Sequence, residues 1–328
     1  MNKSSWIARS LLATVLALSL VGCATGGKSG GYPAKPIELI AAGSPGGGLD
    51  TGARMLEDVN KQEKLGPTFL IANQGGGGGN VARAQLVEKK GNDYVMVYES
   101  NRVWLNNLMG TTEHSIEQTT PIARLTTEYI AWAVKVDSPF KSAKDVIEAA
   151  KKNPSGIRFG VGTIPSNDQF NILRPLQAQG VNIDQVKITA FRSGGDLMTN
   201  LLGGHVDVIS SGLSEMMEQA KAGKVRVLAV SAPKRVAGDA KDVPTWKEQG
   251  IDVEIAHWRG VFGPPGMSEE AVKYWDNYFA KAVKTKTWKA WLTKLGQEDA
   301  YMNSKAFRES LLKERETNRP LVEKFAKK

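Results

Sequence analysis

The sequence predicts an α/β protein with two lobes and a cleft between them. Short apolar runs of the kind found in buried strands alternate with amphipathic segments of helical period, which indicates a mostly parallel sheet with helices. This alternation occurs in residues 37–101 and again from about residue 129 to residue 230. Two comparable blocks in one chain favour two lobes, because each block can form its own sheet.

The chain begins with residues typical of an export signal. Residues 11–20 are apolar but too few to span a membrane, and Leu20-Val21-Gly22-Cys23 resembles a bacterial lipobox, whose cysteine carries a lipid. Cys23 is the only cysteine of the sequence, so an internal disulfide is impossible. We expect a signal peptide over residues 1–22 and a lipidated Cys23 with a flexible tether over 23–31. The mature protein is then anchored to a bacterial membrane, in the periplasm or at the cell surface.

The first candidate binding turn follows a strand expected over residues 37–42. Backbone N–H groups at such a turn can bind an anion, because glycines leave the main chain open and the helix dipole favours negative charge. Asp50 is the candidate N-cap of the helix that follows. The alternative is a connection whose glycines only relieve turn strain. The candidate residues of this turn are Ser44, Gly46, Gly47, Gly48 and Asp50.

Similar turns follow the next two strands, expected over residues 68–72 and 94–98. Ligands of α/β sheets bind beyond the carboxyl ends of the strands, where these turns lie. The first of them has five consecutive glycines but lacks the Gly-Lys-Ser/Thr ending of a P-loop. Asn80 also stands where a dinucleotide fingerprint requires a glycine, so we expect no nucleotide cofactor. The candidate residues are Gly75, Gly76, Gly77, Gly78, Gly79, Asn80, Ser100 and Asn101.

The second block has further candidates at its strand-to-helix junctions. Its strands are expected over residues 130–136, 158–162, 186–191, 206–210 and 225–230, and its first helix over 141–152 with Ser142 as cap. The candidates are Thr163, Ser166, Asn167, Arg192, Ser193 and Ser211. Arg192 is the strongest, because its planar guanidinium group can hold a second carboxylate through two hydrogen bonds. The alternative is a solvent-facing arginine.

The last part of the sequence predicts three amphipathic helices, over residues 268–284, 288–295 and 304–325. Pro320 should kink or split the last of them. We expect these helices to pack on the first lobe, with their Trp and Tyr side chains in the core.

Residues for catalysis or metal binding are not grouped in the sequence. The formal charge is +9, but the basic residues are scattered beside acidic ones, which suits an anionic small ligand or membrane surface and not a nucleic acid. His114, His205 and His257 lack metal-ligand spacing and are interpreted as surface or ordinary packing residues. No Gly-x-Ser-x-Gly motif is present, so binding without a cofactor fits better than catalysis.

Several motifs, in one order along the chain, carry a family resemblance. They include Tyr32-Pro33-Ala34-Lys35-Pro36-Ile37, Pro45-Gly46-Gly47-Gly48-Leu49-Asp50, Leu201-Leu202-Gly203-Gly204-His205-Val206-Asp207-Val208 and Val261-Phe262-Gly263-Pro264-Pro265-Gly266. Together they resemble the extracytoplasmic receptors of tripartite tricarboxylate transporters, the TctC or Bug family.

The resemblance implies a clamshell-like periplasmic binding-protein fold, with a first lobe over residues 32–128, a second over 129–255 and a return to the first over 256–328. It also implies a monomeric receptor without catalytic activity, which captures an organic carboxylate on the two glycine turns and delivers it to the membrane subunits of the transporter. Ser211 falls where many members have an acid, so we expect a di- or tricarboxylate or an aromatic acid ahead of aspartate or glutamate. The alternatives are a surface-anchored lipoprotein hydrolase and a carboxylate-sensing module that acts on a signalling partner.

Overall fold

The computed structural model of the protein describes residues 31–191 and 194–326. The chain divides into an N-terminal unit that ends at Ala34 and a compact unit from Lys35 onward, which contains the helices and strands described below. The expected signal peptide, Cys23, Arg192 and Ser193 lie outside the described residues. Within the described ranges, no helix is both long and apolar enough to cross a membrane.

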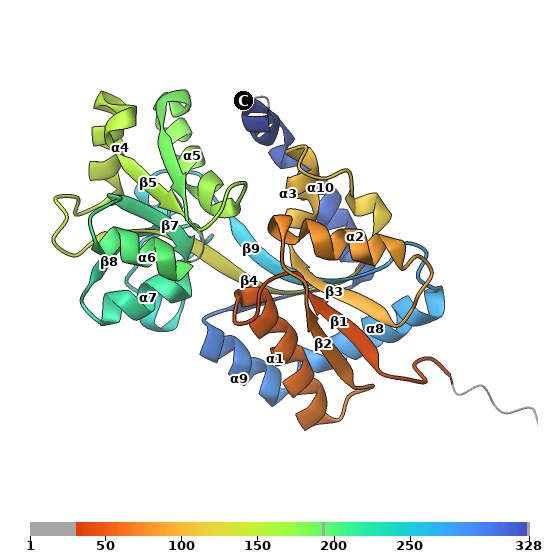
Figure 1. Ribbon diagram of the computed structural model, residues 1–328. Coiled ribbons are helices and arrows are strands. Elements are labelled where there is room, and N and C mark those ends of the chain that lie inside the picture. The colour runs from red at the N-terminus through yellow and green to blue at the C-terminus, as the bar shows by residue number, and fades with distance from the viewer. Residues whose placement is uncertain (1–30, 192–193, 327–328) are drawn as a thin grey trace, which may run out of the picture. The chain divides into compact units, whose positions relative to one another are not determined.

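Strands and helices alternate along most of the chain (Figure 1). The strands are β1 (Ile37–Ala41), β2 (Phe69–Asn73), β3 (Val95–Ser100), β4 (Thr120–Lys135), β5 (Arg158–Val161), β6 (Lys187–Ala190), β7 (Val208–Gly212), β8 (Val225–Val230), β9 (Ala256–Gly263) and β10 (Glu298–Met302). The helices are α1 (Gly48–Glu63), α2 (Asn80–Glu88), α3 (Arg102–Leu108), α4 (Ala143–Lys152), α5 (Asn167–Ala178), α6 (Gly194–Leu202), α7 (Leu213–Lys221), α8 (Glu269–Ala282), α9 (Lys286–Leu295) and α10 (Ser304–Ala326).

The strands form two sheets that share β4. The first sheet has the order β2-β1-β3-β9-β4, with β10 also paired to β4, and we call it with its helices the first lobe. The second sheet has the order β4-β7-β5-β6, with β8 also paired to β4, and it forms the second lobe. Residues 120–129 of β4 pair with β9 and residues 130–135 pair with β7 or β8. The predicted two-lobed α/β fold is confirmed.

The prediction of a mostly parallel sheet is wrong. β1, β2 and β3 are parallel to one another, as are β5, β6 and β7, but β4 is antiparallel to each of its partners and β9 is antiparallel to β3. The strand-helix pattern reveals only the parallel units, because their strands are short apolar runs. β4 begins ten residues before the predicted 130, and β9 and β10 were not predicted, because these segments mix charged and apolar residues.

The predicted packing of the C-terminal helices on the first lobe is confirmed. Helices α8 and α9 contact α1, and α10 contacts α3 and β4. Tyr278 Oη donates a hydrogen bond to Asn60 Oδ1 over 3.0 Å, and Trp291 Nε1 donates to Asp58 Oδ2 over 2.7 Å. Helix α10 continues through Pro320, so the predicted split does not occur. A proline within a helix removes one backbone hydrogen bond. The helix continues because the buried side chains of Phe307 and Leu311 stabilise the turns that precede Pro320.

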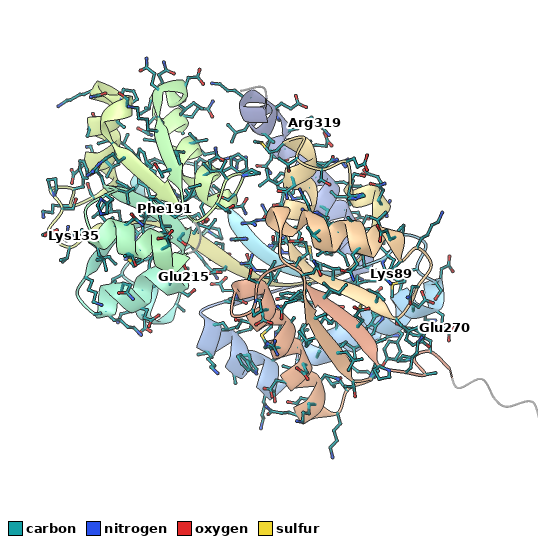
Figure 2. The ribbon with its side chains drawn as sticks, viewed as in Figure 1. Lys89, Lys135, Phe191, Glu215, Glu270 and Arg319 are labelled. Carbon is teal, nitrogen blue, oxygen red and sulfur yellow. The ribbon has the colours of Figure 1, made fainter. Side chains whose placement is uncertain are left out.

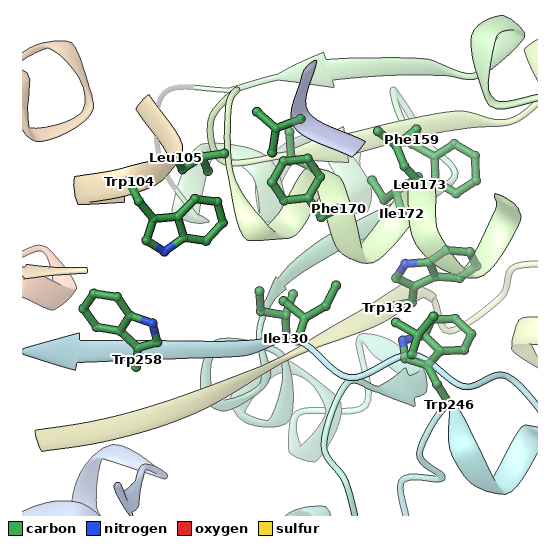
Figure 3. Packing of buried hydrophobic residues seen from close by; sticks show 14 of the residues in the cluster. Trp104, Leu105, Ile130, Trp132, Phe159, Phe170, Ile172, Leu173, Trp246 and Trp258 are labelled. Carbon is green, nitrogen blue, oxygen red and sulfur yellow. The ribbon is translucent and has the colours of Figure 1, made fainter. Parts of the chain in front are cut away.

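Large aromatic side chains fix β4 in the core (Figure 3). Trp132 of β4 lies edge-on to Trp246, with ring centroids 4.7 Å apart, and both are fully buried. Their indole N–H groups donate to the carbonyl and side-chain oxygens of Asn171 in α5, over 2.8 and 2.9 Å. The second-lobe half of β4 is therefore fixed both by apolar burial and by satisfied polar groups.

The capping of α4 is as predicted. The hydroxyl of Ser142 accepts a hydrogen bond from the N–H of Asp145, whose carboxylate accepts one in return from the N–H of Ser142.

Candidate functional site

A cavity of about 460 Å³ lies between the two lobes, within the size range of small-ligand sites. First-lobe residues of its wall come from the turns after β1 and β2 and from the start of α3. Second-lobe residues come from the turns after β5 and β6 and from the end of β7, and β4 and β9 contribute residues at the junction of the sheets. The candidate residues that line it are Ser44, Gly75, Gly76, Gly78, Gly79, Thr163 and Ser211.

The turn after β1 is held together by its own hydrogen bonds. The N–H of Gly46 donates to Asp50 Oδ2 over 2.8 Å, and the N–H of Gly47 donates to the carbonyl of Ser44 over 3.1 Å. Gly46, Gly47 and Gly48 are exposed and lie outside the cavity wall. The part of this turn that lines the cavity is therefore Ala42, Gly43 and Ser44.

Asp50 is not the N-cap of α1, because Gly47 holds that position and Asp50 is the third helical residue. Its buried carboxylate accepts from Gly46 on one oxygen and from Asn73 Nδ2, over 2.9 Å, on the other. Burial alone would raise its pKa, but these hydrogen bonds and one from Arg54 outweigh burial and lower it. An ionised Asp50 thus ties the turn after β1 to the end of β2.

The turn after β2 is built on positive backbone angles. Gly76, Gly77, Gly78 and Gly79 have φ values of 116°, 55°, 63° and 89°, which other residues rarely adopt. Asn106 Nδ2 donates to the carbonyl oxygens of Gly77 and Gly78, over 3.3 and 3.0 Å. The conformation therefore requires glycine and is fixed from the α3 side.

A buried ion pair between Arg83 and Glu99 packs against this turn. Arg83 Nη1 lies 2.6 Å from Glu99 Oε2, with side chains 2% and 1% exposed, and Arg83 Nη2 donates to the carbonyl of Gly78 over 3.1 Å. Asn80 does not line the cavity, since its amide donates to Thr111 and its oxygen accepts from Arg83 and Asn106. These hydrogen bonds indicate that Asn80 stabilises the shape of the glycine turn.

Two arginines that the sequence did not single out line the cavity beside these turns. A Cβ atom on Gly78 would lie 3.4 Å from Arg102 Nη1, and one on Gly48 would lie 3.5 Å from Arg259 Nη2. Arg259 is 8% exposed, and its buried Nε has no hydrogen-bond partner among the described residues. The first-lobe side of the cavity thus combines two guanidinium groups with a glycine turn.

Acidic side chains line the cavity at the second lobe and at the junction of the two sheets. Glu128 of β4, Asp168 of α5 and Glu215 of α7 line the cavity. Burial raises the pKa of Asp168 to about 7; Arg102 opposes the shift, and Glu215 and Glu128 increase it. Burial also raises the pKa of Glu128, against the effects of Arg259 and the hydroxyl of Ser214. Asp168 is therefore partly protonated near neutral pH.

His257 lines the cavity, so its interpretation as a surface or ordinary packing residue is wrong. Burial and the neighbouring Arg259 and Arg102 lower its pKa well below the usual value, so the imidazole is neutral at pH 7. His257 and Arg259 are two residues apart in β9 and therefore share one face of the strand. The sequence shows this spacing, but the spacing indicates a shared face only if the segment is known to be a strand.

The remaining candidates among the described residues lie outside the cavity wall. Ser166 caps α5, accepting from the N–H of Gln169 over 3.2 Å, and the hydroxyl of Ser100 donates to Glu99 Oε1 over 3.1 Å. Asn101 Nδ2 donates to Asn167 Oδ1 over 2.6 Å, and Asn167 Nδ2 donates to the carbonyl of Ala256 over 3.1 Å. The two asparagines thus join the first lobe to the start of α5. Gly77 is in the glycine turn but does not line the cavity.

A second cavity of about 270 Å³ lies between α5, β9 and α10. Arg124, Arg174 and Glu314 line it, and Trp258 Nε1 donates to Glu314 Oε2 over 2.7 Å. Burial raises the pKa of Glu314 to about 7 despite this hydrogen bond and the two arginines. Among the described residues, no three His, Cys, Asp or Glu side chains gather to hold a metal ion at either cavity or elsewhere.

Comparison with known proteins gives one family. Residues 53–326 match the family described as tripartite tricarboxylate transporter family receptor. A protein of Cupriavidus necator, named as a UPF0065 protein in the gbd 5′ region, is 27% identical over 332 residues, which cover 99% of this chain and 98% of that protein.

Solved structures give the same fold. A TctC solute-binding protein from Polaromonas, without ligand, is 27% identical with a TM-score of 0.74, over 89% of this chain and 99% of that one. An R. palustris protein solved with adipate is 21% identical with a TM-score of 0.78, over 90% of this chain and 98% of that one.

Proposed function

This chain belongs to the family of tripartite tricarboxylate transporter receptors, and we propose from that premise that it binds an organic carboxylate in the cavity between its lobes. The bound carboxylate is then delivered to the membrane subunits of a tripartite transporter. The observation that carries the proposal is the basic wall formed by Arg102 and Arg259 beside the glycine turns.

The chemistry of this wall suits a carboxylate. A guanidinium group presents planar pairs of N–H donors that match the two oxygens of a carboxylate. Arg259 is nearly fully buried with a free Nε, and a buried donor without an acceptor costs about 1–3 kcal/mol, which a ligand would recover. The protein related in fold that was solved with adipate supports the choice of an organic acid.

The glycine turn after β2 supplies the second part of the proposed site. Its carbonyl oxygens at Gly77 and Gly78 accept from Asn106 and Arg83, and the N–H of Gly79 donates to the carbonyl of Gly76 over 3.0 Å. The N–H groups of Gly75 to Gly78 are therefore the ones proposed to bind a ligand. Ser44 and Thr163 are proposed to add hydroxyl groups from opposite lobes. Arg192 and Ser193 remain proposed contacts because of their place in the sequence, and Gly75, Gly76, Gly78 and Gly79 because they line the cavity.

The proposal includes export and anchoring. The lipobox-like segment before Cys23 supports a lipid-anchored protein outside the cytoplasm, with residues 23–31 as its tether. Binding as a monomer without catalysis is the expected mode, since the related proteins are solute-binding proteins. The lobes are proposed to span residues 32–128, 129–255 and, returning, 256–328.

A thermal-shift screen tests this function. Mono-, di- and tricarboxylates are compared with neutral sugars and peptides, and a ligand at one hundred times its dissociation constant should stabilise the protein by about 2.7 kcal/mol. If only a sugar or a neutral peptide raises the melting temperature, the proposed function is wrong.

Matched arginine variants locate the binding site. Arg259→Gln, or Arg102→Gln if the former fails to fold, should lower the affinity for the carboxylate about tenfold or more. The control Arg235→Gln removes the same charge from a surface pair with Glu248 and should leave the affinity unchanged. Equal affinities in all three proteins would place the ligand elsewhere.

A further inference from the structure

We propose that the ligand of this cavity carries a protonated amine as well as a carboxylate, so that the substrate class is an aminocarboxylic acid. This inference rests on the proposed function, because it assumes that the carboxylate binds the first-lobe wall. It concerns the acidic residues of the cavity wall, Glu128, Asp168 and Glu215, which we infer select the ligand.

The wall of the cavity carries charged groups of both signs. Arg102 and Arg259 lie by the glycine turns, whereas Glu128, Asp168 and Glu215 come from three different elements, β4, α5 and α7. Figure 2 labels Glu215 and Phe191 on the side of the second lobe nearest the first. A ligand with carboxylates alone would satisfy the arginines but bring negative charge against three acids. A ligand with both charges fits both sides.

The acids are only partly compensated by the protein. Glu128 Oε2 lies 4.0 Å from Arg259 Nη2, and Glu128 Oε1 accepts from the hydroxyl of Ser214 over 2.8 Å. In the part of the chain that the structure describes, no Lys or Arg nitrogen lies within 4.0 Å of a carboxylate oxygen of Asp168 or Glu215. His257 is neutral at pH 7 and supplies no positive charge. An ammonium group of a ligand, with three N–H donors, would donate hydrogen bonds to these carboxylates and balance their negative charge.

Ser211 was the reason to expect a plain acid ahead of an amino acid, and the structure removes that reason. The hydroxyl of Ser211 donates to Glu215 Oε2 over 3.1 Å, so a carboxylate reaches this part of the cavity from the first turn of α7 instead. The missing acid at position 211 is therefore replaced by Glu215, four residues later.

Proton exchange distinguishes an amine ligand from a plain dicarboxylate. Burial and the negative charges of Glu215 and Glu128 raise the pKa of Asp168 to about 7, so this carboxyl group is partly protonated at neutral pH. Bound ammonium lowers the pKa of nearby carboxyl groups and releases these protons, whereas a second ligand carboxylate raises the pKa and takes protons up. Among the described residues, the other charged side chains of the wall are Arg102 and Arg259.

The test is calorimetry at pH 7 with pairs of acids that differ only in the amine. Suitable pairs are succinate with aspartate, glutarate with glutamate, and butyrate with γ-aminobutyrate, each in two buffers of different ionisation enthalpy and both with and without EDTA. We expect the amine member of at least one pair to bind about tenfold or more tightly than its partner, with net release of protons.

Two variants of one helix provide the matched comparison. Glu215→Gln, whose side chain is exposed and can still accept from Ser211, should weaken the amine ligand about tenfold and change the plain acid by less than about twofold. Glu218→Gln removes the same charge from α7 outside the cavity wall and should change neither. Asp168→Asn should reduce the number of protons released.

The outcomes separate the two proposals. If plain di- or tricarboxylates bind as tightly as their amine analogues and take up protons, the amine inference is overturned while the carboxylate receptor stands. Tight binding of a plain acid that EDTA abolishes overturns it in favour of a metal–carboxylate complex. If no member of any pair binds while a neutral solute does, the proposed function fails as well.

Discussion

Replacing Gly79 by alanine tests whether the glycine turn after β2 is packed against a buried ion pair. Gly79 has φ of 89°, and a Cβ atom there would overlap the Glu99 carboxylate and lie 3.0 Å from Arg83 Nη1. The left-handed backbone costs alanine about 1–2 kcal/mol. Separating Arg83 from Glu99, which are 2.6 Å apart and buried, costs about 3–5 kcal/mol more. The free energy of unfolding should therefore fall by about 4–7 kcal/mol.

The control for this change is Gly91→Ala. Gly91 has a similar φ of 75°, but no atom lies within 4 Å of the place that a Cβ would take, so it should lose only the backbone contribution of about 1–2 kcal/mol. Urea unfolding, followed by tryptophan fluorescence, measures both variants against the parent protein. Equal losses in the two variants would refute the close packing of the turn on Arg83 and Glu99.

Two other predictions concern protonation and anchoring. The pKa of Asp168 is about 7 in the folded protein against 3.8 when unfolded, so the folded state binds more protons between these values and stability falls as pH rises through them. Relative to Asp168→Asn, the parent should lose about 2–4 kcal/mol of unfolding free energy between pH 4 and pH 8, and parallel pH curves for the two proteins would contradict this. Cys23→Ala should move the protein from the membrane to the soluble fraction of cells, because the lipid provides the attachment; retention in the membrane fraction would exclude that anchor.

The parallel parts of the fold could be predicted because their residues are patterned locally. Residues 37–42 and 68–72 are short apolar runs ending in glycine turns, and both form parallel strands that lead to the cavity. Glycine is required where a turn needs positive φ, so the run from Gly76 to Gly79 marks a special backbone in the sequence itself. The first ten residues of β4 and all of β9 carry Arg, Glu or His among apolar residues, so period and composition gave no strand signal there.

The charged wall of the cavity could not be predicted for a related reason. Arg259 and Glu128 face each other only because β9 pairs with β4, and that pairing depends on contacts between residues more than a hundred positions apart. Asp168 directly follows the candidate Asn167, but the sequence does not say which neighbouring side chain faces the ligand. Asn101 and Asn167 were candidates for ligand binding, but in this structure their side chains bond to each other and lie outside the wall of the cavity between the lobes.

The most direct test is a crystal structure of the protein with the best carboxylate from the binding screen. A carboxylate of the ligand should lie within about 3.2 Å of a guanidinium nitrogen of Arg259 or Arg102, or of an N–H group between Gly75 and Gly79, in the cavity between the lobes. A ligand bound instead at the second cavity, against Arg124 and Arg174, would contradict the assignment of the site.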